Sequence, residues 1–111
     1  MTLATSFVLV AIAGGFGAVA RFWLSTCSGK LPWGILLANS IGSFIAGLAI
    51  SGSIETAWLV VGLAGGLSTF STFAAQTHNL VAKKELALAS LNIVLNLLIP
   101  AVSFLTASIL L

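Results

Sequence analysis

Four long apolar stretches run through this chain, and short polar segments separate them. The stretches without any charged residue cover residues 1–20, 31–54, 56–82 and 86–111. A helix needs about 20 apolar residues to cross a bilayer, and each stretch meets that length. The pattern predicts an all-α integral membrane protein with one domain, residues 1–111. Its four transmembrane helices are expected at about 3–24, 32–51, 56–79 and 86–110.

The third stretch contains the sequence GLAGGLSTFSTF, residues 62–73, which is a poor helix former. Glycine costs about 1 kcal/mol relative to alanine inside a helix, and Gly/Ser clusters are sites of kinks. Lipid cannot satisfy freed backbone groups, so irregular backbone must be buried in protein or line a wet cavity. Beyond this point Phe70 and Phe73 share one helix face. A polar stripe lies beside them, made of Thr69, Thr72, Gln76 and Asn79. We predict a third helix that is broken near its middle and borders a path for a small ion.

Three polar side chains stand out in the first two spans, and two of them have alternative explanations. Arg21 ends the first stretch as an interfacial anchor or as a charge on an ion path. Asn39 and Ser43 lie one turn apart in the second span. The Asn39 amide either bonds to another helix or donates into a pore. Gly14 and Gly17 fall on one face of the first span and predict a close helix contact there.

The fourth span carries Asn92 and Asn96 one turn apart, followed by Pro100. The proline removes the N–H that would bond to the carbonyl of Asn96. The face that contains Asn92, Asn96 and Ser103 is therefore expected to point inward. Hydrogen bonding between helices is an equally good explanation of this face.

Composition agrees with a membrane protein, since 59% of the residues are hydrophobic and only 5% are charged. Soluble domains are about 25% charged. The net charge of +2 indicates topology rather than a nucleic-acid partner. With four spans, the first and third connections lie on one side of the membrane, and that side holds all the basic residues: Arg21, Lys30, Lys83 and Lys84. The positive-inside rule then places both termini outside the cell.

Chemistry-bearing residues are too few and too scattered for an enzyme, because no nucleophile–base pair or metal-binding cluster is present. A small drug/proton antiporter also has four spans, but it needs a carboxylate within the membrane. The acids here, Glu55 and Glu85, belong to the connections. An assembly subunit without transport of its own is the other alternative.

Three segments are similar to a known family. Residues 14–21 (GGFGAVAR), 33–44 (WGILLANSIGSF) and 65–73 (GGLSTFSTF) resemble the Fluc/CrcB family of fluoride channels. The resemblance implies a dimer of antiparallel four-helix subunits in the inner (plasma) membrane, with two fluoride pores and a central structural sodium ion. Such a channel exports cytoplasmic fluoride passively and confers fluoride resistance.

The resemblance also implies the site residues. The sodium ion would be held by the backbone carbonyls of Gly65 and Ser68 from both subunits. Arg21 would match the family's first-span arginine. The pore would be lined by Asn39, Phe70, Ser71, Thr72 and Phe73. The chain departs from the family at Ser68, where threonine is usual, at Gln76, where an acid is common, and in having no tyrosine. Asn92 and Asn96 are candidates for an alternative polar track.

Orientation raises a further question about the partner. A homodimer of antiparallel subunits needs a chain that inserts both ways, and the one-sided distribution of basic residues opposes this. The alternative is a subunit of fixed orientation that pairs with a homologous, oppositely oriented partner.

Overall fold

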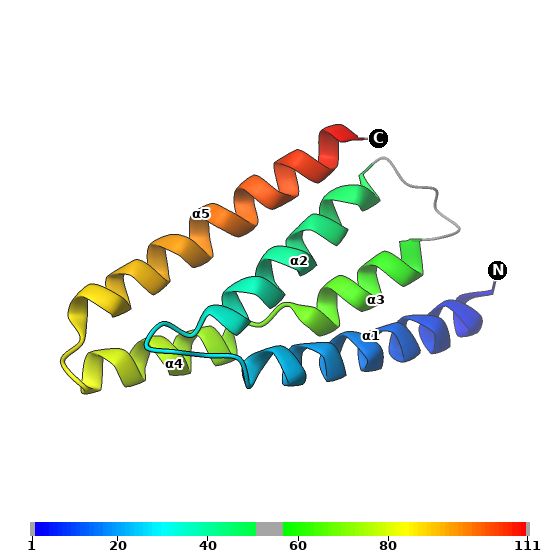
Figure 1. Ribbon diagram of the computed structural model, residues 1–111. Helices are drawn as coiled ribbons and strands as arrows, with labels where there is room; N and C mark the ends of the chain where they lie inside the picture. Colours follow the sequence, from blue (N-terminus) through cyan, green and yellow to red (C-terminus); the bar gives the residue numbers. More distant parts are fainter. Residues whose placement is uncertain (1, 51–56, 111) are drawn as a thin grey trace.

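The computed structural model describes residues 2–50 and 57–110, and within that part all regular structure is helical. The helices are α1 (Leu3–Ser25), α2 (Trp33–Ala49), α3 (Ala57–Leu67), α4 (Ser71–Ala82) and α5 (Leu86–Leu110). Figure 1 shows them side by side, with α3 and α4 following one another as two halves of one span.

The helices form an elongated slab whose dimensions are 51 × 28 × 18 Å. Packed helix axes lie about 8–10 Å apart, so the thin direction of the slab has no room for a helix with neighbours on all sides. Many large apolar side chains are therefore exposed, among them Phe7, Phe16, Trp23 and Ile109. Such surfaces require lipid or another apolar chain to cover them, as in a multi-pass membrane protein.

Within residues 2–50 and 57–110, three stretches of helix are long and apolar enough to cross a membrane: Leu3–Ser25, Ala57–Ala82 and Leu86–Leu110. The second span is shorter than predicted, because α2 has 17 residues. That length is at the lower limit for a spanning helix. The third span continues to Ala82, three residues beyond the predicted end. The predicted second connection, Ser51–Glu55, lies outside the described residues.

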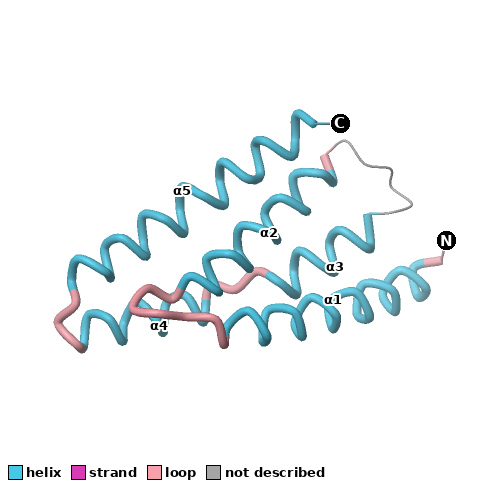
Figure 2. The backbone as a smooth tube through the Cα atoms, viewed as in Figure 1, coloured by secondary structure: helices cyan, strands magenta, loops and turns pink. Residues whose placement is uncertain are grey.

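The predicted break in the third span is confirmed: it lies within the predicted stretch, residues 62–73, and directly after the three glycines. Helix α3 continues through Gly62, Gly65 and Gly66 to Leu67, and residues 68–70 are not helical (Figure 2). The glycines serve packing instead. A Cβ at Gly66 would collide with the backbone of α1 at Gly14, and a Cβ at Gly62 would lie 2.8 Å from the carbonyl oxygen of Val10. The predicted close contact of Gly14 and Gly17 in α1 is thus made with α3.

The α1–α2 and α4–α5 connections lie at one end of the slab, and both termini lie at the other (Figure 1). The first connection carries Lys30, and the second carries Lys83 and Lys84. The arrangement agrees with the sidedness expected from the sequence. The α4–α5 turn is closed by hydrogen bonds from the Lys84 and Glu85 amides to carbonyls of α4, with Lys84 in the left-handed region at φ 60°.

Candidate ion site at the broken helix

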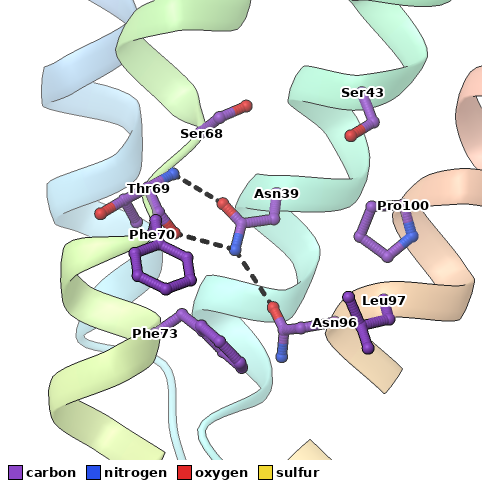
Figure 3. A pocket seen from close by; sticks show the side chains of 9 residues that line it. All are labelled: Asn39, Ser43, Ser68, Thr69, Phe70, Phe73, Asn96, Leu97 and Pro100. Atoms are coloured by element: carbon purple, nitrogen blue, oxygen red, sulfur yellow. Dashed lines mark hydrogen bonds between the residues drawn. The ribbon is translucent and has the colours of Figure 1, made fainter. Parts of the chain in front are cut away.

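The break is held open by the side chain of Asn39, which reaches it from α2. Asn39 Oδ1 accepts the backbone N–H of Thr69 at 2.7 Å, and Asn39 Nδ2 donates to the Thr69 carbonyl at 3.2 Å (Figure 3). One half-buried side chain thus satisfies both backbone polar groups of the central residue of the break. Unpaired backbone groups at this depth would be costly, so Asn39 makes the irregular backbone tolerable.

The hydrogen bonds at the break leave two carbonyls without their usual helical partners. In an unbroken helix the amide of Thr69 would bond to the carbonyl of Gly65, and the amide of Thr72 to that of Ser68. Here Thr69 N donates to Asn39, and Thr72 N donates to the hydroxyl of Thr69 at 3.1 Å. Carbonyl oxygens are hard ligands suited to hard cations. Gly65 and Ser68, which are both exposed, therefore have backbone oxygens to offer a cation.

A cavity of about 320 Å³ opens beside the break, between α2, α4 and α5. Phe70 and Phe73 form one wall, with ring centroids 5.7 Å apart and planes tilted by 53°. Phe70 is 78% exposed. Figure 3 shows the residues that line the cavity: Asn39, Ser43, Ser68, Thr69, Phe70, Phe73, Asn96, Leu97 and Pro100.

A second cavity, of about 340 Å³, contains the hydroxyl residues that follow the break and the charge of α1. Arg21, Ser71 and Thr72 line it together with Thr69. The predicted site residues are therefore divided between two cavities, and Thr69 borders both. Arg21 is half-buried and lies beside the break, in the same cavity as Thr69.

The asparagines of α5 point inward, as expected, and they are bonded between helices. Asn92 is 1% exposed, and its Nδ2 donates to Thr77 Oγ1 of α4 at 2.9 Å. Asn96 Nδ2 donates to Asn92 Oδ1 at 3.0 Å, and Asn96 Oδ1 accepts from Asn39 Nδ2 at 3.1 Å. Asn39, Asn92 and Asn96 thus all take part in hydrogen bonds between helices.

Comparison with known proteins decides the family. The family model described as "CrcB-like protein, Camphor Resistance (CrcB)" matches residues 8–108. The chain belongs to the CrcB family. A relative from Pyrococcus abyssi, named "Fluoride-specific ion channel FluC", is 40% identical over 110 residues that cover 89% of each chain.

Two further relatives have the same name and similar identity to this chain. One from Francisella tularensis subsp. holarctica is 41% identical over 98 residues, which cover 74% of this chain and 88% of the relative. One from Geobacter sulfurreducens is 35% identical over 102 residues, covering 80% and 82%. The resemblance noted in the sequence is confirmed, and the family is one of channels rather than enzymes.

Inspection of the sequence did not reveal the role of Thr69 at the break, and it did not single out Thr77. Thr69 was assigned to a polar stripe, whereas its backbone and hydroxyl organise the break. Thr77 was not singled out, yet it receives the bond from Asn92. The remaining members of the stripe, Gln76 and Asn79, line a different cavity next to Lys30 and Lys83. Gln76 Oε1 is buried there and has no hydrogen-bond partner among the described residues.

Proposed function

We propose that this CrcB protein is a fluoride-selective passive channel that lets cytoplasmic fluoride leave the cell through the inner membrane. The observation that carries the proposal is the pair of phenylalanine rings open to a cavity at a helix break. The names of its relatives support the choice of ion. Hydrogen fluoride enters cells as a neutral acid and dissociates inside, and the inside-negative potential then drives the anion out.

The residues at the break suit a small anion that holds its water tightly. An aromatic ring is positive at its edge, so Phe70 and Phe73 can meet an anion edge-on. The hydroxyls of Ser71 and Thr72 are donors that replace lost water. Asn39 already donates both amide hydrogens within the protein, so an anion at this point competes with Asn96 Oδ1 for one of them. Several weak sites in series let the ion leave again.

The proposed sodium site is at the same break and consists of backbone carbonyl oxygens. Its ligands would be the carbonyl oxygens of Gly65 and Ser68, whose usual amide partners bond elsewhere. When bound, sodium supplies a fixed positive charge that compensates the freed carbonyls and joins two subunits. The described residues offer no cluster of three or more His, Cys, Asp or Glu side chains for a metal, so backbone oxygens are the ligands to expect.

The channel is proposed to be a dimer of antiparallel subunits that face each other across the exposed side of the break. Gly65, Ser68 and Phe70 are exposed on one subunit, which is what a shared site requires. The basic end of the slab favours one orientation in the membrane. A subunit of fixed orientation with a homologous partner is therefore the second candidate. A drug/proton antiporter is the weaker alternative, because the acids of the chain lie outside the spans.

The test is fluoride efflux from liposomes that contain only this protein, read with a fluoride electrode. Fast efflux with no matching chloride efflux supports a channel made from one kind of subunit. Efflux that needs a homologous second subunit supports the heterodimer. Chloride efflux as fast as fluoride efflux would contradict the proposed selectivity.

A further inference from the structure

A chain of five hydrogen bonds links the helix break to α4 by way of α2 and α5. Every bond runs in the same direction, each group donating to the next: Thr69 N to Asn39 Oδ1, Asn39 Nδ2 to Asn96 Oδ1, Asn96 Nδ2 to Asn92 Oδ1, Asn92 Nδ2 to Thr77 Oγ1, and Thr77 Oγ1 to the Phe73 carbonyl. Their lengths lie between 2.7 and 3.1 Å. We call these groups the asparagine chain.

The two ends of the asparagine chain lie on either side of the aromatic pair in the sequence. It begins at Thr69, directly before Phe70, and ends at the carbonyl of Phe73. The two rings therefore lie on a segment that is bonded to α2 at Thr69 and, through Thr77, to α5 at its other end. Helix α4 packs mainly on α5, so the bond from Asn92 to Thr77 is a direct tie between them.

The direction of the bonds determines how each amide is oriented. An asparagine amide has an acceptor oxygen and a donor nitrogen, so turning it over exchanges the two. Asn96 presents its oxygen to Asn39 because its nitrogen is engaged by Asn92, through both the side-chain oxygen and the backbone carbonyl. Successive bonds in one direction also polarise and strengthen one another. The buried end of the chain thus orients Asn39 at the open end.

The orientation of Asn39 matters for both parts of the proposed channel. Its oxygen draws the Thr69 amide away from Gly65, and its nitrogen holds the Thr69 carbonyl next to Phe70. A loosened Asn39 would allow the Thr69 amide to return to the carbonyl of Gly65, which would change the backbone that carries Phe70.

We propose that Asn92 and Asn96 are positioning residues of the ion pathway, which hold Asn39, the break and the aromatic pair in the conducting arrangement. Asn92 acts from a buried place, outside both cavities at the break. The inference rests on the proposed fluoride channel, and it assigns the network of α5 a role that a simple contact between helices would not have.

The first experiment replaces Asn92 by aspartate and measures fluoride efflux at two pH values. An ionised carboxylate accepts from Asn96 but cannot donate to Thr77, so the chain is interrupted. A protonated carboxyl does both, which restores it. We expect Asn92→Asp to be slower than the unmodified protein by about tenfold or more at about pH 8, and to recover at about pH 5. Leak of neutral hydrogen fluoride is subtracted with protein-free liposomes.

The control variant is Ser90→Asp, which adds a carboxylate on the exposed side of α5 two residues away. Fluoride efflux through Ser90→Asp should not increase at the lower pH. A folded Asn92→Asp protein that is slow at both pH values, or fast at both, would overturn the inference. Silence of the unmodified protein would instead contradict the proposed function.

A neutral variant covers the case in which Asn92→Asp does not fold. Thr77→Val keeps the shape of the side chain but removes the acceptor for Asn92 and the donor to Phe73. We expect a loss of fluoride efflux of about tenfold, with the protein still folded. Thr106→Val, at an exposed position of α5, is its control. If Thr77→Val conducts fluoride as fast as the unmodified protein, the inference is overturned.

Discussion

The contact between α1 and α3 depends on Gly17, and the substitution Gly17→Ala tests how tightly the two helices fit. Gly17 is buried against the backbone of α3. A Cβ there would lie 2.7 Å from the carbonyl oxygen of Leu63, and 3.0 Å from Gly66 Cα. Ordinary contact begins at 3.4 Å, so the helices would have to separate by roughly 0.7 Å. Backbone atoms cannot rotate away as a flexible side chain can.

A second glycine on the same helix provides a matched control. A Cβ at Gly14 would have the Gly62 carbonyl oxygen as its nearest neighbour, at 3.7 Å, so Gly14→Ala fits. Both substitutions gain up to about 1 kcal/mol from the better helix propensity of alanine, and this gain cancels in the comparison. Overpacking costs about 1–3 kcal/mol. Gly17→Ala should therefore be less stable than Gly14→Ala by about 1–3 kcal/mol.

The assay is reversible unfolding in detergent micelles, followed by tryptophan fluorescence, because Trp23 of α1 and Trp58 of α3 report on the two helices concerned. The quantity compared is the free energy of unfolding of the two variants under the same conditions. Equal stability of Gly17→Ala and Gly14→Ala would show that α1 and α3 are not packed at this distance.

Three further predictions concern transport. Phe70→Ile and Phe73→Ile keep apolar bulk but lose the positive ring edge. Each substitution should slow fluoride efflux about tenfold or more. The control Phe7→Ile, on the exposed face of α1, should leave efflux unchanged. If all three variants conduct fluoride at the same rate, the aromatic pair is not part of the pathway. Replacing sodium by a large organic cation during purification should reduce efflux, and adding sodium should restore it; full activity without sodium would argue against the site at Gly65 and Ser68. Cysteines placed at either terminus of a Cys27→Ser protein should react with an impermeant maleimide from outside the cell only, since the basic connections favour the cytoplasm; reaction with equal fractions from both sides would indicate dual orientation.

The pattern of apolar and polar residues was sufficient to predict the features of this protein that a lipid bilayer imposes. Long uncharged stretches have to be helices in a bilayer, because every backbone group must be bonded within the chain. The all-helical structure followed from that requirement, and the pattern of polar residues predicted the inward face of Asn92 and Asn96. The family was recognisable because the segments around Gly14, Asn39 and Phe70 are specific in type and order.

The position of the break could not be derived in this way, and the reason is physical. Glycine lowers the stability of a helix locally, and this predicted a break within residues 62–73 without indicating at which of these residues the helix ends. The close approach of α1 outweighs that cost, because glycine alone admits the neighbouring backbone there. The chain leaves the helix after Leu67, and at Thr69 a side chain from another helix satisfies the freed amide and carbonyl.

The roles of individual polar residues were also decided by the tertiary structure. By sequence alone, Asn39 was as well suited to line a pore as to bond to another helix, since an amide serves both purposes. Its actual partners are 30 and 57 residues away along the chain. Which donors are already engaged, and which carbonyls are left without them, depends on how α2, α4 and α5 come together around the break. The sequence determined that a membrane helix is interrupted by hydroxyl and aromatic residues; only the packing of three other segments determined which of its groups remain available to an ion.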